Sequence, residues 1–286
     1  VRMATIFKNK SFTYITRFQV AIAMGCNVPT KHYSTMKCTP INKKGSDCPE
    51  RFDCPSITDH VNSKCYFNGD TYALSEQVPN EKVAPFCSAL CYCRSGSPFA
   101  QFRCTHVDCA EFFHRFDYDN CIRTYKPNGC CSSGQVCGED KKKLAKCTVD
   151  GDEYLTGQRM HPNSNKCLTC ICHEGFNEAN IGSDPNCYET TCGFELFYAK
   201  QAYGGAAPVY YEDRCCPWEW RMPKDSDKLI KGSSKNTDKQ LQCQYGRLTM
   251  NVGDRLETEV TDQYTYECSC QIPPLAQCVM TKAKKE

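Results

Sequence analysis

The stretch Cys-Leu-Thr-Cys-Ile-Cys, residues 167–172, places three cysteines within six positions. Cysteines this close serve as metal ligands, as a redox-active pair, or as disulfide bridges. The whole chain has 26 cysteines among 286 residues, an even number at the density of a disulfide scaffold. Leu, Ile, Val and Phe together number only 48, so the core is thin for a chain of this length. Disulfides can substitute for a core by constraining the unfolded chain, which indicates an oxidising compartment.

An ordered series of cysteines occurs twice in the chain. One copy begins CYFNGDTY at Cys65 and the next begins CTVDGDEY at Cys147, and both read Cys-x-x-x-Gly-Asp-x-Tyr. Each copy continues through a tight cluster, a pair separated by four residues, and two adjacent cysteines. A third, shorter copy starts at Cys243 and ends with Cys268, Cys270 and Cys278. The chain is therefore built from repeated cysteine-rich units.

This pattern resembles the von Willebrand factor type C module, the cysteine-rich module of chordin-, kielin- and crossveinless-type proteins, and is similar to arthropod kielin/chordin-like proteins. The resemblance covers residues 65–137 well, residues 147–216 in part, and residues 243–278 as a half module. A full module has ten cysteines, which residues 65–137 supply. The family pairs the first with the fourth, second with eighth, third with fifth, sixth with ninth and seventh with tenth. The pairs implied here are Cys65–Cys93, Cys87–Cys130, Cys91–Cys104, Cys109–Cys131 and Cys121–Cys137.

The shorter copies provide an internal check on this implied pairing. The second copy lacks the seventh and tenth cysteines, and the third lacks the second and eighth; in each case the two are partners, so no orphan thiol remains. The further implied bridges are Cys147–Cys172, Cys167–Cys215, Cys170–Cys187, Cys192–Cys216, Cys243–Cys270 and Cys268–Cys278. Four cysteines are left over, Cys26, Cys38, Cys48 and Cys54. We expect them to pair among themselves, and three pairings stay open.

Zinc and redox chemistry are the alternatives for the clustered cysteines. Closed zinc sites favour two Cys-x-x-Cys knuckles, or one with a histidine pair at ligand spacing, and the chain offers neither. Thioredoxin-like exchange needs a Cys-x-x-Cys at the start of a helix in a βαβ unit, which the pattern also lacks. We therefore expect disulfides, no metal and no cofactor.

The expected fold is small, disulfide-rich, mostly β and irregular, an elongated tandem of von Willebrand factor type C-like modules. Short alternating stretches such as TYALSEQV indicate strands, and no stretch shows a helical period. No apolar run is long enough for a transmembrane helix. The expected segments are a basic N-terminal segment 1–25, a four-cysteine unit 26–60, a complete module 61–142, a degenerate module 143–221, a polar linker or loop 222–242, and a half module with a basic tail 243–286.

Two aromatic clusters are candidates for contact with a protein partner. In disulfide modules such aromatics can equally form the core, and that alternative stays open. The candidate residues are Tyr72, Phe112, Phe113, Phe116, Tyr210, Tyr211, Trp218 and Trp220. Asn9 begins the one glycosylation sequon, Asn-Lys-Ser.

The sequence favours a secreted, extracellular protein that is not an enzyme, because no catalytic motif occurs. The resemblance implies capture or presentation of a growth factor of the bone-morphogenetic-protein and TGF-beta class. The alternative is a structural or adhesive component of the extracellular matrix or of a larger assembly. Residues 1–46 contain eight Lys or Arg and no Asp or Glu, which suits a sulfated glycan, a solvated tail without a partner, or a mitochondrial transit peptide; the cysteines argue against the last. We expect no nucleic-acid partner.

Overall fold

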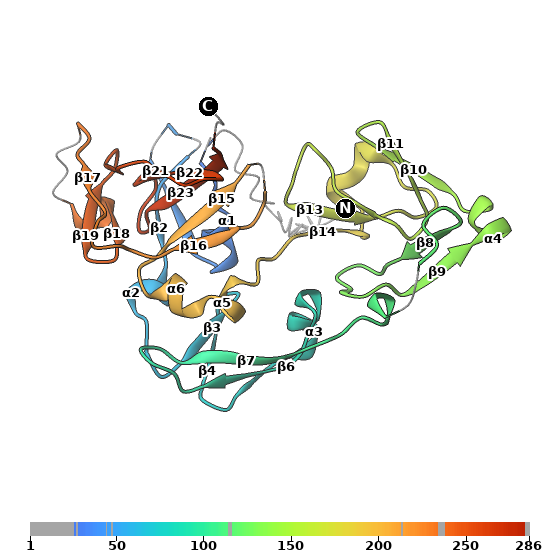
Figure 1. The fold of residues 1–286 in the computed structure, drawn as a ribbon, viewed down its shortest axis with the longest axis horizontal. Helices are drawn as coiled ribbons and strands as arrows, with labels where there is room; N and C mark the ends of the chain where they lie inside the picture. The colour runs from blue at the N-terminus through green and yellow to red at the C-terminus, as the bar shows by residue number, and fades with distance from the viewer. Residues whose placement is uncertain are drawn as a thin grey trace, which may run out of the picture.

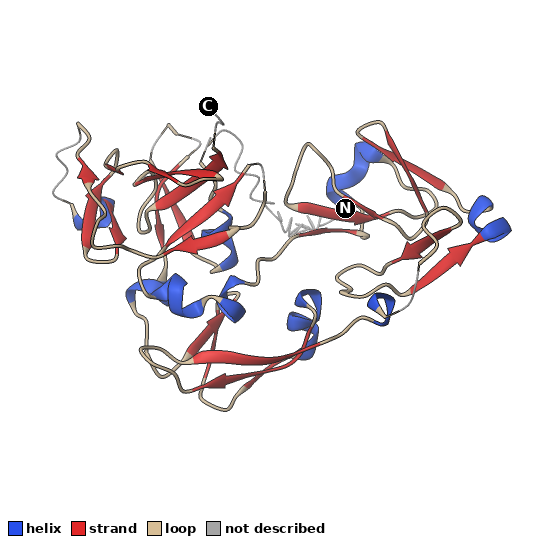
Figure 2. Ribbon diagram, viewed as in Figure 1, coloured by secondary structure: helices blue, strands red, loops and turns tan. Residues whose placement is uncertain are grey.

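The computed structural model describes residues 26, 28–43, 45–46, 48–113, 116–212, 214–233 and 238–283. The fold is disulfide-rich and mostly β, with short strands and irregular connections (Figures 1 and 2). Thirteen disulfides cross it. The described residues contain no helix long and apolar enough to cross a membrane.

The three copies found in the sequence share one arrangement, a two-stranded hairpin followed by a three-stranded antiparallel set. In the first copy these are β3 (Cys65–Phe67), β4 (Asp70–Tyr72), β5 (Gln77–Val78), β6 (Ser88–Arg94) and β7 (Gln101–His106). In the second they are β10 (Lys146–Val149), β11 (Asp152–Leu155), β12 (Arg159–Met160), β13 (Leu168–Ile171) and β14 (Cys187–Glu189). In the third they are β18 (Gln242–Tyr245), β19 (Leu248–Asn251), β20 (Arg255–Leu256), β22 (Tyr264–Ser269) and β23 (Gln277–Lys282).

The hairpin turns explain the Gly-Asp signature of the first two copies. Asn68 and Gly69 have φ of 51° and 84°, and Asp150 and Gly151 have φ of 51° and 88°. Two consecutive residues with positive φ form the tight turn whose twist matches antiparallel strands, and Asn-Gly and Asp-Gly tolerate it best. The aspartate that follows each glycine begins the second strand.

Cross-strand disulfides occupy the same register in all three copies. Cys91 faces Cys104, Cys170 faces Cys187, and Cys268 faces Cys278 on neighbouring antiparallel strands. The Cα–Cα distance is 4.0 Å in each pair. A second bridge joins each hairpin to its sheet, with Cα–Cα distances of 5.7, 5.8 and 5.6 Å. Each copy thus has a small core around these bridges.

The third copy is enlarged into a seven-stranded sheet that includes strands from outside residues 243–286. Its order is β16-β15-β23-β22-β20-β17, with β21 (Glu259–Val260) paired to β22. The added strands are β15 (Ala207–Tyr211), which runs parallel to β23, β16 (Glu219–Arg221) and β17 (Leu229–Ile230). The last part of the expected degenerate module 143–221, from β15 to β16, therefore shares a sheet with residues 243–286, whereas β10 to β14 form sheets of their own. Residues 222–242, expected as a linker or loop, contribute β17 and η4 (Lys239–Leu241).

The N-terminal four-cysteine unit packs on this sheet. It contains α1 (Lys31–Thr35), β1 (Thr39–Asn42), β2 (Pro49–Asp53) and α2 (Pro55–Thr58). The Tyr33 hydroxyl donates to the Ile272 carbonyl at 2.7 Å, and the Phe52 N–H donates to the Pro273 carbonyl at 2.8 Å. One core joins Tyr33 and Phe52 to Trp220 and Leu275. The first and last segments that the structure describes therefore meet in one lobe, and the copies do not form a straight row (Figure 1).

The chain leaves this lobe through the first copy and returns through α5 (Phe194–Phe197) and α6 (Ala199–Tyr203) (Figure 1). Leu196 of α5 is buried in the core of the first copy, while Phe194 is buried in the core shared with the N-terminal unit. The remaining elements are α3 (Asn80–Val83), η1 (Ala84–Phe86), η2 (Ala110–Phe112), β8 (Cys121–Thr124), β9 (Gly134–Cys137), α4 (Gly138–Lys142) and η3 (Glu178–Ser183).

Candidate protein-binding surfaces

The disulfide framework is the rigid base of every candidate surface. All eleven pairs that the family resemblance implies are present in the structure. The four remaining cysteines form Cys26–Cys48 and Cys38–Cys54. Cys38 precedes β1 and Cys54 follows β2, and the pairing of Thr39 with Asp53 sets these cysteines opposite each other. The hairpin register, which spacing alone does not reveal, therefore selects this pairing.

Two bridges of the first copy touch. The Cys109 Sγ lies 3.5 Å from the Cys130 Sγ, although Cys109 is bonded to Cys131 and Cys130 to Cys87. Cys87, Cys109 and Cys130 lie close enough together to hold an ion. Cysteine binds a metal as its thiolate, and these sulfurs are committed to disulfides. The cluster therefore acts as a covalent junction.

The first aromatic surface comprises Phe113, Phe116, Tyr118 and Arg123. Phe113 is 72% exposed and Tyr118 is 74% exposed. The Phe116 and Tyr118 rings meet edge to face at 4.7 Å, and the Arg123 guanidinium lies 4.3 Å from the Phe116 ring centre. Aromatic and arginine side chains are those enriched in protein interfaces. The structure describes no side-chain position for Phe112.

Hydrogen bonds and bridges hold the backbone under this surface. The Glu111 carboxylate accepts from the Ser132 N–H at 2.9 Å and from its hydroxyl at 2.7 Å. Burial alone raises the pKa of Glu111, but the hydrogen bonds from Ser132 outweigh it and hold this pKa below its ordinary value. Arg123 also donates to the Glu111 carbonyl at 3.1 Å. These contacts and the Cys109–Cys131 bridge fix the backbone at Glu111, where this surface begins, which reduces the ordering cost of binding.

The second aromatic surface comprises Tyr211, Arg214, Trp218 and Tyr264, on β15 and β22 and the loop after β15. Tyr211 packs edge to face on Tyr264 at 5.7 Å and lies 6.3 Å from the half-exposed Trp218. The Arg214 guanidinium lies 4.5 Å from the Trp218 ring centre. Sequence reasoning found Tyr211 and Trp218 but missed Tyr264 and Arg214. The alternation in Tyr264-Thr-Tyr-Glu is a strand signal, but it does not indicate that this strand lies near Tyr211.

Three of the candidate contact residues are buried. Tyr210 lies under α1, where its hydroxyl is 2.8 Å from His32 Nδ1. Trp220 packs on Phe194 with ring centres 5.0 Å apart. Tyr72 meets Phe102 edge to face at 5.6 Å inside the core of the first copy. These three side chains belong to the core and are not available to a partner, because strand geometry turns them inward.

Two further candidates from the sequence fall mostly or wholly outside the described residues. Asn9, the sequon position, and residues 1–25 lie there. Of the basic region 1–46, Lys31 forms an ion pair with Glu189 at 2.6 Å. Lys31 therefore forms a contact within the fold.

No protein-family model, no curated protein and no solved structure matches this chain. The disulfide framework and the two exposed aromatic surfaces are therefore the features of the molecule that bear on its function.

Proposed function

We propose that this chain is a secreted, extracellular, non-enzymatic binding protein built from von Willebrand factor type C-like modules. Its partner is a protein, a growth factor of the bone-morphogenetic-protein and TGF-beta class, which it captures or presents. The observation that carries the proposal is the first aromatic surface. Large exposed aromatics beside an arginine, held by disulfides on both sides, have the composition and rigidity of an interface hot spot.

A second candidate function is a structural or adhesive component of the extracellular matrix or of a larger assembly. The two aromatic surfaces favour it, because β8 and β22 lie in opposite halves of the molecule (Figure 1). Surfaces so placed suit a bridge between two partners, whereas capture of one ligand uses neighbouring surfaces. The basic region 1–46 adds a proposed contact with a sulfated glycan.

Surface-binding measurements test the proposal directly. The oxidised full chain is immobilised and exposed to purified growth factors from several branches of the class. Phe113→Ala and Tyr118→Ala should each weaken binding by about 2 kcal/mol or more if they are hot spots. Leu74→Ala, another exposed apolar residue of the first copy, serves as the matched control and should leave affinity unchanged.

Three outcomes separate the candidate functions. Binding that depends on Phe113 and not on Leu74 supports capture through the first aromatic surface. Absence of binding to every growth factor by correctly oxidised protein overturns capture. Recovery of matrix proteins whose binding requires both Phe113 and Trp218 supports the bridging role instead.

A further inference from the structure

The β7 strand forms an open edge of its sheet. The three-stranded sheet has the order β5-β6-β7, so β7 pairs with β6 on one side only. An open edge presents unpaired backbone N–H and C=O groups, which bind another extended chain unless something covers them. The other side of β7 faces α5 and α6. The space between β7 and these two helices decides whether another extended chain can pair with β7.

The register identifies which backbone groups face this open side. Cys91 and Cys104 lie directly opposite with Cα atoms 4.0 Å apart, the close spacing of a non-hydrogen-bonded pair. The N–H and C=O groups of Cys104, and of Phe102 two residues earlier, therefore point away from β6. Among the described residues, no backbone group outside β6 forms a hydrogen bond with the N–H or C=O of Phe102 or Cys104.

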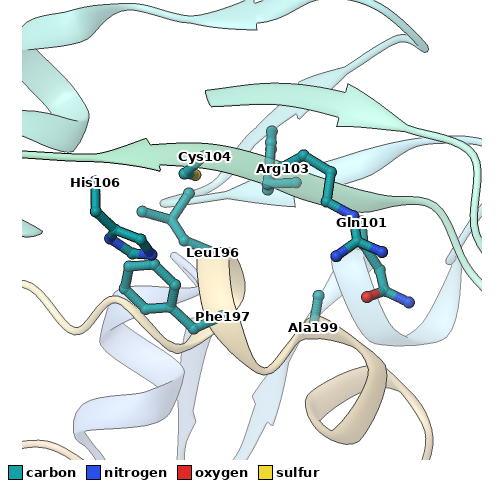
Figure 3. Close-up of a pocket in the computed structure, with 8 residues that line it drawn as sticks. Gln101, Arg103, Cys104, His106, Leu196, Phe197 and Ala199 are labelled. Atoms are coloured by element: carbon teal, nitrogen blue, oxygen red, sulfur yellow. The ribbon is translucent and has the colours of Figure 1, made fainter. Parts of the chain in front are cut away.

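A cavity of about 220 Å³ lies against this edge (Figure 3). One wall is β7 from Gln101 to His106, and the other consists of Leu196, Phe197 and Ala199. The His106 ring stacks on Phe197 with ring centres 5.8 Å apart and closes one end. Phe197 is 43% exposed, so solvent reaches the apolar wall opposite β7. We call this cavity the β7 groove.

The polar lining of the β7 groove is neutral or basic. Gln101 and Arg103 extend from β7 toward the wall that contains Ala199 (Figure 3). The groove lining contains no acidic residue. Glu195, the acid next to Leu196, is turned away, since its carboxylate accepts from the Asn68 N–H at 2.6 Å and from the Tyr203 hydroxyl at 2.5 Å. A ligand in the groove therefore meets a cation without a competing carboxylate.

We propose that the β7 groove binds an extended peptide segment of a partner protein that carries acidic side chains, by strand addition to β7. Backbone groups of the peptide would pair with those of Phe102 and Cys104, and an acidic side chain would meet Arg103. The edge from Phe102 to His106 is about 13 Å long at roughly 3.3 Å per residue, which suits four peptide residues. This binding mode is independent of the growth-factor proposal, because it uses neither aromatic surface.

A second copy of this chain is the less suitable occupant. Two antiparallel β7 edges would bring Arg103 close to its own counterpart, and like charges facing each other oppose pairing.

Three synthetic heptapeptides test the proposal by fluorescence anisotropy with the oxidised full chain. The first alternates valine and glutamate, the second alternates valine and lysine, and the third is the first with proline at its centre. The first peptide should bind. The second should bind at least about tenfold more weakly, because it meets Arg103 with like charge. The third should also lose binding, because proline removes a ladder donor.

Amide exchange measured by NMR locates the peptide. On addition of the first peptide, the amides of Phe102 and Cys104 should exchange at least about tenfold more slowly, whereas the Arg103 amide, already in the β6–β7 ladder, should change little. Arg103→Glu should weaken binding about tenfold. Arg94→Glu, an exposed arginine of β6 outside the groove lining, is the matched control and should not.

Several results would overturn the proposal. These are equal binding of all three peptides, protection of amides elsewhere than along β7, or an Arg94→Glu effect equal to that of Arg103→Glu. A peptide-free dimer that already protects Phe102 and Cys104 would assign the edge to a second copy. Because the assay contains no growth factor and mutates neither aromatic surface, its failure leaves the proposed function standing, and the converse also holds.

Discussion

The Glu195 carboxylate accepts a hydrogen bond from the backbone N–H of Asn68, 127 positions earlier in the chain, at an O–N distance of 2.6 Å. Asn68 lies in the β3–β4 turn of the first copy, and Glu195 is fully buried in α5. The Tyr203 hydroxyl donates to the other carboxylate oxygen at 2.5 Å. A polar group buried this deeply needs such partners. The pair joins the first copy to the lobe that contains both ends of the described chain.

The Glu195 contact predicts a pH-dependent stability. Burial raises the pKa of Glu195 to about 7, although the hydrogen bonds from Tyr203 and Asn68 act in the opposite direction. The folded state therefore holds the proton more tightly than the unfolded state. The stabilisation that protonated Glu195 gives the folded state is therefore complete below the ordinary glutamate pKa and is lost as pH rises through 7. The loss is on the order of 3 kcal/mol for a pKa raised from the ordinary value to about 7.

Denaturant unfolding at pH 5 and pH 8 measures this loss when wild type is compared with Glu195→Gln. The variant does not titrate, so its stability should fall less between the two pH values. His60, whose ring centre lies 4.5 Å from that of Tyr203 and whose pKa burial lowers, titrates in both proteins and cancels in the comparison. Parallel pH dependences would contradict the role assigned to Glu195.

Sequence reasoning reached the local units but not the way they are joined. The family resemblance carried by the cysteine series implied eleven of the thirteen bridges, and the Gly-Asp turns marked the hairpins. The insertion of Leu196 into the first copy has no local signal, because α5 is only four residues long and has no helical period to detect. Whether Tyr210 or Tyr211 faces the core depends on the strand register, which adjacent aromatics leave open.

The Arg221–Asp227 ion pair should hold residues 222–233 against the sheet. The Arg221 Nη2 lies 2.5 Å from Asp227 Oδ1, and both side chains are almost fully buried. Burial alone raises the pKa of Asp227, but the hydrogen bonds from Arg221 and the Lys224 N–H keep it below its ordinary value. Arg221 also pairs with Glu259 at 2.8 Å, so Asp227→Ala removes one of its two carboxylate partners and should cost about 1.5–3 kcal/mol. The 222–233 segment should then detach from the sheet.

Limited trypsin digestion measures this detachment, since Lys224, Lys228 and Lys231 lie in the segment. Asp227→Ala should be cut there faster than wild type, whereas the exposed Asp225→Ala should not. Because the folded Asp227 pKa is lowered, its contribution is present above the ordinary aspartate pKa and is lost as pH falls below it. Equal digestion of both variants would show that the ion pair does not order the segment.

Two disulfides of the first copy should differ in importance although they close loops of similar size. Cys121–Cys137 spans 16 positions and Cys91–Cys104 spans 13, so chain entropy predicts about 3 kcal/mol for each. Of these two bridges, Cys91–Cys104 has counterparts in both other copies and Cys121–Cys137 has none. Cys91 is fully buried in the core of the first copy, and serine there would bury a hydroxyl at further cost.

Paired cysteine-to-serine variants test this difference. The variant with serine at 121 and 137 should fold with twelve bridges, counted by mass before and after reduction. The variant with serine at 91 and 104 should be less stable in guanidinium by an additional 1–3 kcal/mol or so. Equal losses, or scrambled bridges in the 121/137 variant alone, would contradict the ranking.

Phe113 and Tyr72, both contact candidates from the sequence, should respond oppositely to truncation. Phe113 is exposed, so Phe113→Ala should change the free energy of unfolding by no more than about 0.5 kcal/mol. Tyr72 is buried against Phe102, so Tyr72→Ala opens a cavity and should cost about 3 kcal/mol or more. Chemical denaturation of the two purified variants measures both values, and disulfide mapping checks that each retains thirteen bridges. A large loss of stability in Phe113→Ala would place this ring in a packed environment and remove the first aromatic surface as a binding site. A stable Tyr72→Ala would instead show that the disulfides, and not the aromatic core, hold the first copy together.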